Sequence, residues 1–456
     1  MTATLESVPT APGRLPALGH LGPLVLRRLP FVRSLRAHGD LVRVYFGGRP
    51  VYVVTSPTLV RELLVEHGGE FDKGSIFDEG KAFLGEGLIT SAGELHRRQR
   101  RLIQPEFTAA RIRDYVPVMR ETALRVTAEW RAGRPVRVDQ AMLRVAFGTV
   151  TGVMFSGCLP PGAEDPLLRE LRLLIQGALL RAFAPGLVRR LPGQRRYDRS
   201  VAEVRAITER LLDQCAAAPV RRADPIHRLH TVTGPGAEHG MSPEQLRDEL
   251  ISIMIAGTET TGGALAWALH ELANRPEVAD RVAGEVDRVV GDAPVTAEAV
   301  DELHYTHRVL CEVLRRRATW LSTRRALRPV TLGGVPVPTG TEFAFSLYAL
   351  HHDPELYPRP EEFDVDRWLP ESANARPRGT FMPFLEGTRK CLGHSFAWTE
   401  LAVVVATLAG RWRFAPGPGR VREVAVSTIR PSRLTLVPLP RSARSARHQG
   451  EQEVRL

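Results

Sequence analysis

One cysteine stands in a setting that would stabilise a thiolate. Cys391 lies in the segment FLEGTRKCLGHSFA, directly after Arg389 and Lys390 and just before an apolar run with helical periodicity. The N–H groups at a helix start and two neighbouring cations both favour a negative sulfur. Gly387 and Gly393 carry no side chain, so the backbone can turn sharply and a bulky group can lie close. A stabilised thiolate beside a flat, cleared space is what a metal-bearing macrocycle requires.

A second group of polar residues interrupts the longest apolar helical run. Ser242 and Gln245 form a capping box ahead of the run and Pro276 ends it, so the sequence predicts a helix over Pro243–Asn274. The stretch AGTETTGG lies at its centre, where glycine, threonine and a carboxylate are poor helix formers. A buried Glu259 without a partner would be costly. The stretch indicates either a functional site or a tolerated kink where another helix crosses.

A third candidate is the basic run in GELHRRQRRLIQPEF. His96 and Arg100 are four residues apart and share one face of the predicted helix, whereas Arg97 and Arg101 share an adjacent face. Spacing alone leaves two interpretations open. Either the first pair points inward, or the whole run is a solvated basic face.

The cysteine segment carries a recognisable signature. Phe384-x-x-Gly387-x-Arg389-x-Cys391-x-Gly393 fills all five fixed positions of the haem-binding signature, and the chain resembles the cytochrome P450 family over nearly its whole length. The resemblance implies that Cys391 is the axial thiolate ligand of the iron in haem b, that is, iron protoporphyrin IX. It also implies that Phe384 packs against the sulfur side of the haem. Arg389 would pair with a haem propionate.

The same resemblance gives roles to the centre of the long helix. Ala256 and Gly257 would make room over the iron, and Glu259 and Thr260 match the family's catalytic acid–alcohol pair. Splitting bound dioxygen requires two protons, which an alcohol holding water with a carboxylate behind it can relay. The alternative for Thr260 is a hydrogen bond back to a helix carbonyl.

Further propionate partners follow from the resemblance. His96 and Arg100 match the helix positions that hold the haem propionates, and this favours the inward interpretation of that pair. Arg324 matches another propionate position. Arg325 is the alternative if the register slips by one residue.

A third motif is assigned to structure rather than to chemistry. Glu312 and Arg315 match the family's ExxR, and Arg367 in PEEFDVDRW would complete a triad. By spacing alone, Glu312 and Arg315 would most often be a surface pair worth roughly 0.2–0.5 kcal/mol. The chain departs from the family at residues 316–318, where Leu-x-Pro is usual, and at Val365, where proline is common. These departures leave open the path of the next segment, which normally lines the substrate pocket.

The elements that would hold these residues are mostly helical. The β-rich runs Leu41–Phe46 and 51–55 flank a Gly-Gly-Arg-Pro turn and predict a hairpin. Helical periodicity then dominates to about residue 318, a second β-leaning patch covers 325–345, and a helix is expected near 394–408.

We therefore expect a mainly α fold with a small β-sheet subdomain. It would be a single large domain of the cytochrome P450 type over residues 1–440, with the long helix crossing over the haem. The last residues, 441–456, read as a polar, disordered tail.

Composition narrows the class of protein. The chain has 456 residues, of which 43% are hydrophobic, enough for a sizeable core. The net charge is +11, but the basic residues are spread along the chain, which argues against nucleic acid as a partner. The four cysteines form no CxxC pair and indicate a reducing, cytoplasmic compartment. Apart from Cys391, we interpret them as small buried hydrophobes: Cys158, Cys215 and Cys311.

No membrane anchor is predicted. The N-terminus lacks the basic start and apolar stretch of a secretory signal. No window approaches the ~18 consecutive apolar residues of a membrane span, so a soluble protein is expected. A Leu/Pro-rich segment near residues 21–31 either touches a membrane surface or packs on the core.

The resemblance implies a haem-thiolate monooxygenase that inserts one oxygen atom from O2 into an unactivated C–H bond. Electrons would come from NAD(P)H through a ferredoxin reductase and a small acidic ferredoxin. Arg97 and Arg101, near the cysteine side of the haem, would form a basic dock for that ferredoxin. The protein is expected to act as a monomer.

The substrate is expected to be compact and apolar. The pocket-lining positions implied by the family are largely apolar: residues 77–89, 181–187, 251–256 and 320–321. The segments LHRRQRRLIQPEF, TRRA and FDVDRWLPE are similar to those of bacterial members that oxidise sesquiterpenes. This favours a pentalenene-like sesquiterpene in terpenoid natural-product biosynthesis, such as an antibiotic pathway of secondary metabolism. Alternatives are a fatty acid, steroid or polyketide substrate, a peroxide-using enzyme, a non-catalytic haem sensor and a basic nucleic-acid-binding protein.

Overall fold

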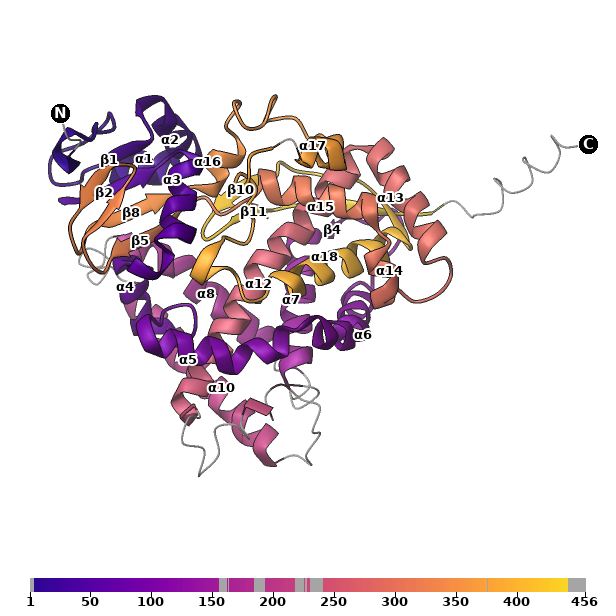
Figure 1. Cartoon of the computed structure of the whole chain (residues 1–456). Coiled ribbons are helices and arrows are strands. Elements are labelled where there is room, and N and C mark those ends of the chain that lie inside the picture. The colour runs from indigo at the N-terminus through magenta and orange to yellow at the C-terminus, as the bar shows by residue number, and fades with distance from the viewer. Residues whose placement is uncertain are drawn as a thin grey trace, which may run out of the picture.

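The longest helix runs through the middle of the molecule. In the computed structural model, which describes residues 4–155, 162, 164–183, 193–217, 225, 228–229, 241–374 and 376–441, α12 spans Pro243–Asn274 (Figure 1). The Ser242 hydroxyl accepts a hydrogen bond from the Gln245 N–H, and the Gln245 side chain accepts one from the Ser242 N–H, both at 3.2 Å. The predicted capping box and both ends of this helix are confirmed.

Helices surround α12 and bury it. α7 (Val138–Phe155) packs on it most extensively, and α18 (His394–Ala409), the helix predicted after the cysteine, also packs on it. Apolar side chains of these and neighbouring helices form one large core cluster. The other helices are α1 (Leu21–Leu26), α2 (Arg28–Ser34), α3 (Pro57–Arg61), α4 (Ser75–Leu84), α5 (Gly93–Ile103), α6 (Ala109–Val126), α8 (Glu164–Phe183), α10 (Gln194–Ala217), α13 (Pro276–Val289), α14 (Ala297–Asp301), α15 (His304–Arg316), α16 (Leu347–His351) and α17 (Pro370–Asn374).

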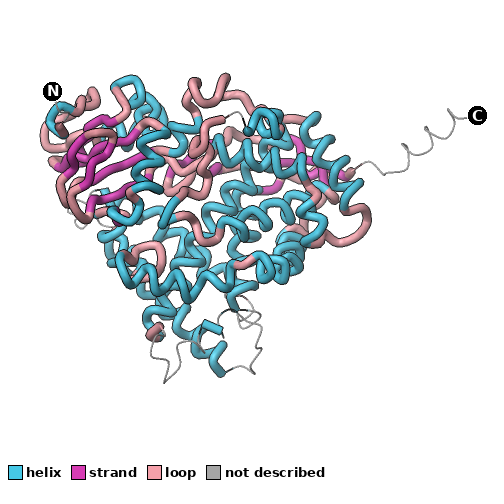
Figure 2. The backbone as a smooth tube through the Cα atoms, in the orientation of Figure 1, coloured by secondary structure: helices cyan, strands magenta, loops and turns pink. Residues whose placement is uncertain are grey.

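A mixed sheet lies at the N-terminal side of the molecule (Figure 2). Its strand order is β1-β2-β8-β5-β3, and β1 pairs with β2 as the predicted hairpin around Gly47-Gly48. The second β-leaning patch supplies β5 to β8, which confirms that prediction with a start a few residues earlier. The bounds are β1 (Leu41–Phe46), β2 (Arg49–Val54), β3 (Phe71–Asp72), β5 (Ser322–Ala326), β6 (Val330–Leu332), β7 (Val335–Val337) and β8 (Glu342–Phe345).

Smaller sheets follow the last helix. β10 (Arg422–Ala425) pairs with β11 (Ile429–Ser432), and β12 (Thr435–Pro440) lies between β4 (Val136–Arg137) and β9 (Trp412–Pro416). The expected fold class, mainly α with small sheets, is confirmed.

At the two ends of the chain, the sequence predicted a Leu/Pro-rich segment and a polar tail. In the Leu/Pro-rich segment, Leu24 and Phe31 are buried, so the segment packs on the core, although Leu26 is 83% exposed. The predicted tail lies outside the described residues apart from Arg441, whose guanidinium donates to both carboxylate oxygens of Asp287. Within the described residues, no helix is long and apolar enough to cross a bilayer.

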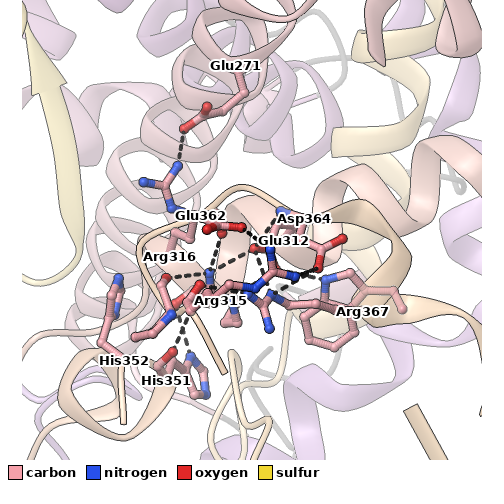
Figure 3. A network of polar contacts seen from close by, with 12 residues as sticks. Glu271, Glu312, Arg315, Arg316, His351, His352, Glu362, Asp364 and Arg367 are labelled. Carbon is pink, nitrogen blue, oxygen red and sulfur yellow. Dashed lines mark hydrogen bonds and ion pairs between the residues drawn. The ribbon is translucent and has the colours of Figure 1, made fainter. Parts of the chain in front are cut away.

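Figure 3 shows the predicted triad brought together, with Glu312 and Arg315 on α15 and Arg367 in the turn Val365–Trp368. Glu312 and Arg315 are fully buried and form a bidentate pair, with Nε–Oε2 and Nη2–Oε1 distances of 2.9 and 2.7 Å. Arg367 Nε lies 3.6 Å from Glu312 Oε1. The surface-pair interpretation of Glu312 and Arg315 is therefore wrong, because tertiary packing covers both side chains.

The network explains how the chain accommodates its departure from ExxR-Leu-x-Pro. Arg316 Nη1 donates to Glu271 Oε1 on α12 at 3.0 Å. Arg317 pairs with Glu423 and stacks over Trp267, with its Cζ 3.9 Å from the ring centroid. Both extra cations are therefore paired with acids, and Val365 is buried in a short 3-10 turn.

Candidate active site

A cavity of about 400 Å³ lies between α12 and the cysteine segment. Most of its lining side chains are apolar, including Val150, Val153, Met154 and Ala264. Nine of the ten residues predicted for the site line it: His96, Arg100, Ala256, Gly257, Thr260, Arg324, Phe384, Arg389 and Cys391. These nine residues come from four separate stretches of the sequence and meet in one space.

Cys391 forms part of the cavity wall just before α18. Its N–H donates to the Phe384 carbonyl at 2.9 Å, which closes the loop between them. The thiol is exposed to the cavity but lies deep among protein atoms. Burial raises its pKa, outweighing a hydrogen bond from the Gly393 N–H and the charges of Arg100 and Lys390. We expected cations to dominate here, but burial outweighs them in the protein alone; a bound metal cation would favour the thiolate.

The two glycines beside the cysteine serve different purposes. Gly387 has φ +73°, and a Cβ there would lie 1.8 Å from the Leu64 carbonyl oxygen. Its small size is therefore required by neighbouring backbone rather than by a ligand. Gly393 lines the cavity, where a Cβ would meet only Phe107 at 3.7 Å.

Seven basic side chains line the cavity, of which Arg317 pairs with Glu423 and Lys390 is exposed; the other five are Lys73, His96, Arg100, Arg324 and Arg389. Burial, and then repulsion from other members of this group, lowers the pKa of His96 to about 3 and that of Arg324 to about 10. In the described part of the chain, none of the five lies within ion-pair distance of a carboxylate, and Arg389 Nη1 has no hydrogen-bond partner. Arginines that line a cavity without counter-charges, with a neutral His96 beside them, fit a ligand that carries two negative groups. We call these five residues the cationic cluster.

The choice between neighbouring arginines is settled by strand alternation. Arg324 lines the cavity, whereas Arg325 turns to the opposite face of β5 and pairs with Asp72 and with Asp78, the latter at 2.7 Å. The basic run on α5 is divided in the same way. His96 is buried and Arg97 is exposed, so the interpretation of the whole run as a solvated face is wrong.

Lys73 was missed in the sequence. The chain contains only three lysines, Lys73, Lys81 and Lys390, among 62 basic residues. Two of these three line the cavity. The rarity of lysine in this chain was the signal that could have identified Lys73 as a site residue.

The centre of α12 supports both interpretations of AGTETTGG. The Thr260 hydroxyl lines the cavity and donates to the Ala256 carbonyl at 2.6 Å, so the back-bonded form is present. A Cβ on Gly257 would lie 2.6 Å from Val150 Cγ2, and one on Gly262 would lie 2.9 Å from Leu143 Cα. The stretch therefore accepts the crossing helix α7 and also faces the cavity.

Glu259 is the predicted site residue that does not line the cavity. Its Oε1 accepts a hydrogen bond from Arg430 Nε at 2.9 Å, on the opposite side of α12. Burial raises its pKa, although Arg430 and Arg172 act in the other direction. Around it is a separate pocket of about 30 Å³, roughly the size of one water, which Asp139 also lines. Sequence reasoning missed Arg430 because β11 reaches α12 only in the folded chain.

The prediction of the residues that line the substrate pocket is correct in part. Phe77, Leu88 and Ile89 line the cavity from the first range, and Ser252, Ile253 and Ala256 line it from the third. The prediction for 320–321 is wrong: Trp320 is 1% exposed in another core cluster and donates to the Val426 carbonyl, while its neighbours Thr319 and Ser322 line the cavity. The side chains of 181–187 lie outside the described residues.

Comparison with known proteins gives consistent matches over nearly the whole chain. A family model described as Cytochrome P450 matches residues 9–438. "Cyclooctatin synthase" and "Cyclooctat-9-en-7-ol 5-monooxygenase" of Streptomyces melanosporofaciens are each 37% identical; the first alignment covers 94% of this chain and 95% of the relative, and the second covers 90% of each. "Pentalenene oxygenase" of Streptomyces avermitilis is 33% identical over 94% of this chain and 96% of the relative. The crystal structure of the cytochrome P450DA heme domain superposes with a TM-score of 0.84 at 26% identity, covering 95% of this chain and 98% of that one.

Proposed function

The chain belongs to the cytochrome P450 family, as a haem b-dependent monooxygenase that uses O2 and electrons from redox partners, and from that membership we propose that it oxidises a C–H bond of a cyclic terpene. The observation that carries the proposal is the cavity, in which an apolar wall faces the predicted thiolate across a space of about 400 Å³. Apolar walls bind a hydrocarbon by removing its surface from water.

Cys391 is proposed as the iron ligand, and four members of the cationic cluster as the groups that hold the haem propionates. The residues fit this cofactor because Arg100, Arg324 and Arg389 with His96 supply hydrogen-bond donors and lack counter-charges of their own. The His96 imidazole is neutral at physiological pH and would act as a hydrogen-bond donor. When bound, thiolate-ligated haem supplies the dioxygen activation that no side chain can provide.

Small residues and an aromatic ring would shape the two sides of the haem space. Ala256 and Gly257 place little more than helix backbone against it. Phe384 lines the cavity and packs against the rings of His394 and Trp398, at centroid distances of 6.5 and 5.7 Å. These contacts support a fixed position for Phe384 beside Cys391.

Thr260 and Glu259 are proposed to deliver protons, but from two sides of α12. After giving up its hydrogen bond to the Ala256 carbonyl, Thr260 Oγ1 would pass its proton to the cavity face and take another from Glu259, which regenerates the hydroxyl. Glu259 would take up a proton in its own small pocket, and its raised pKa favours the protonated form there. Transfer to the cavity then requires Glu259 to leave Arg430 and turn toward Thr260.

Two terpene classes are supported by different observations. The segments LHRRQRRLIQPEF, TRRA and FDVDRWLPE favour a pentalenene-like sesquiterpene, and a relative that is 33% identical is named for pentalenene. Two relatives at 37% identity are named for cyclooctatin and for cyclooctat-9-en-7-ol, a cyclic alcohol. A fatty acid is less suitable, because the cavity's free cations are needed for the two propionates.

The electron donor is proposed to be a ferredoxin reduced by a ferredoxin reductase. Arg97 and Arg101 are exposed on α5. Arg100, between them, donates to the Lys390 carbonyl at 2.9 Å and so ties this helix to the cysteine segment. An acidic partner docked on the two exposed arginines would lie close to Cys391.

The remaining expectations are kept as proposals. A single copy carries all ten predicted site residues, which supports a monomer. Residues 1–440 are proposed as one domain. Among the described cysteines, Cys311 and Cys391 carry free thiols, which supports a cytoplasmic location.

The test is a spin-state titration of the haem-loaded protein with pentalenene and with cyclooctat-9-en-7-ol, followed by turnover under ¹⁸O2. We expect one of the two to displace iron-bound water and to yield a product with one labelled oxygen. No spectral change and no labelled product from either compound would contradict the terpene proposal while leaving family membership intact.

A further inference from the structure

One wall of the cavity is an irregular segment, residues 85–91, with the sequence GEGLITS. It connects α4 to α5, and its Leu88 and Ile89 line the cavity beside Ser252 and Ile253 of α12. A segment without helix or strand leaves its backbone polar groups without the usual partners. The side chains that bond to these backbone groups instead determine the position of this cavity wall.

The segment lies directly on α12. A Cβ on Gly85 would fall 2.0 Å from Asp248 Oδ2, and one on Gly87 would fall 2.2 Å from Ser252 Oγ. Gly85 also has φ +70°. Glycine at these two positions therefore lets the backbone reach the surface of the helix.

Two consecutive acids of α12 accept hydrogen bonds from the segment. Asp248 Oδ2 accepts from the Glu86 N–H at 2.9 Å, and Glu249 Oε2 accepts from the Leu88 N–H at 2.8 Å. Glu249 is fully buried, and its other oxygen, Oε1, has no hydrogen-bond partner among the described residues. Its one described hydrogen bond therefore holds the cavity wall.

Two further side chains donate to the segment's carbonyls. Lys73 Nζ lies 2.6 Å from the Leu88 oxygen, 2.6 Å from the Ile89 oxygen and 3.3 Å from the Ser91 oxygen, which uses its three N–H groups. Gln99 Nε2 of α5 donates to the Glu86 carbonyl at 2.6 Å. Leu88 is thus held through both its N–H and its carbonyl, and Ile89 is held through its carbonyl.

Burying these two ionisable groups is unfavourable on its own. Burial raises the pKa of Glu249 to about 8. Burial, followed by repulsion from Arg389, Arg324 and Arg100, lowers the pKa of Lys73 to about 7. Apolar residues would satisfy packing without this cost, so the contacts to the wall are the evident reason for both groups.

We propose that Glu249 and Lys73 are positioning residues for substrate selectivity, which fix Leu88 and Ile89 as the wall that limits the shape of the bound substrate. Neither needs to touch the carbon that reacts. The proposal rests on the proposed function only in taking this cavity as the substrate site. It extends that function by naming residues outside the reacting centre that decide which molecules fit.

The experiment uses the haem-loaded protein with Glu249→Leu and Glu249→Gln. Leucine removes the acceptor for the Leu88 N–H, whereas glutamine keeps a carbonyl oxygen in its place. The matched control is Glu400→Leu: Glu400 of α18 is also fully buried with its pKa raised to about 8, but it lies beside Thr149 and does not contact the segment.

Two readouts are taken, neither of which depends on a terpene. Hydrogen exchange reports the peptide that contains residues 85–91, and two azole probes, imidazole and 4-phenylimidazole, report the cavity. In Glu249→Leu we expect exchange at Leu88 to rise about tenfold, since a buried N–H loses its partner. The affinity for 4-phenylimidazole should change about tenfold while that for imidazole changes less than twofold. Glu249→Gln should restore both values.

The proposal is overturned if Glu249→Leu keeps wild-type exchange and probe affinities, if glutamine fails to restore them, or if Glu400→Leu produces the same changes. Should Glu249→Leu fail to fold, Gln99→Leu, which removes the donor to the Glu86 carbonyl, is assessed by the same criteria. Failure of the terpene proposal would leave both readouts unaffected, so the two can be judged separately.

Discussion

Replacing Arg324 by methionine should change stability with opposite signs in the haem-free and haem-loaded forms. Arg324 is 3% exposed, and its guanidinium donates to the Thr323 carbonyl at 2.7 Å. Burial, followed by repulsion from Arg389, lowers its pKa from 12.5 to about 10. A base whose pKa is lowered by folding is harder to charge in the native state than in the unfolded chain. The charged side chain therefore destabilises the haem-free protein at neutral pH.

The magnitude follows from the pKa. The difference of about 2.5 corresponds to about 3 kcal/mol at 1.36 kcal/mol per pKa unit. Losing the hydrogen bond to the Thr323 carbonyl offsets about 1 kcal/mol of this. Haem-free Arg324→Met should thus be about 2 kcal/mol more stable than the parent protein. In the loaded form the variant loses a charge-assisted bond to a propionate, worth about 1.5–3 kcal/mol.

The assay is urea unfolding of both forms, with haem release to excess apomyoglobin as a second measurement. The matched control is Arg325→Met, because Arg325 pairs with Asp72 and Asp78 and its pKa is raised. That control should lower the stability of both forms alike. If Arg324→Met destabilises the haem-free protein as much as the loaded one, the cationic cluster is not a preformed dianion site.

Three further predictions concern other parts of the fold. Glu312→Leu or Arg315→Leu alone should cost about 3–5 kcal/mol in urea unfolding, because each strands a buried charge, whereas the double variant should cost clearly less than the two singles added; additive costs would contradict this. Burial raises the pKa of Glu400 to about 8, so Glu400 contributes stability below its unfolded pKa that is lost as pH rises through 8. The free energy of unfolding of Glu400→Gln should therefore gain about 1.4 kcal/mol per pH unit over that of the parent protein between pH 6 and 8. Parallel curves of unfolding free energy against pH would refute the raised pKa. Arg97→Glu with Arg101→Glu should weaken turnover driven by ferredoxin at least tenfold and spare peroxide-driven turnover, and an equal loss in both assays would argue against the dock.

Sequence reasoning succeeded where the determinants are local. The capping box at Ser242 and the stop before Pro276 lie within a few residues of the helix ends that they define, so the bounds of α12 follow directly. Because side chains alternate between the two faces of β5, only one of Arg324 and Arg325 faces the cavity, and it is Arg324. The sequence alone narrowed the choice to these two residues.

The prediction that Glu259 and Thr260 act side by side at one site was too simple. Successive residues of an α-helix are about 100° apart, so Glu259 and Thr260 differ in direction, but two neighbours can still line one wide cavity, as Ala256 and Gly257 do. Glu259 instead meets Arg430 of β11. Its direction follows from the packing of β11 on α12 and not from helical periodicity alone.

The segment 85–91 shows what local reasoning cannot reach. Its position depends on Asp248 and Glu249, about 160 residues away, and on Lys73, which precedes it by fewer than 20. No periodicity links these groups. Only the packing of the segment against α12 makes their contacts with its backbone possible.

The most direct test of the account is the absorption spectrum of the reduced, carbon monoxide-bound protein, measured for the parent chain, Cys391→Ala and the control Cys311→Ala. We predict the red-shifted Soret band of thiolate ligation in the parent and in the Cys311 variant, and its loss in the Cys391 variant. Persistence of that band without the Cys391 sulfur would contradict the assignment on which the proposed site depends.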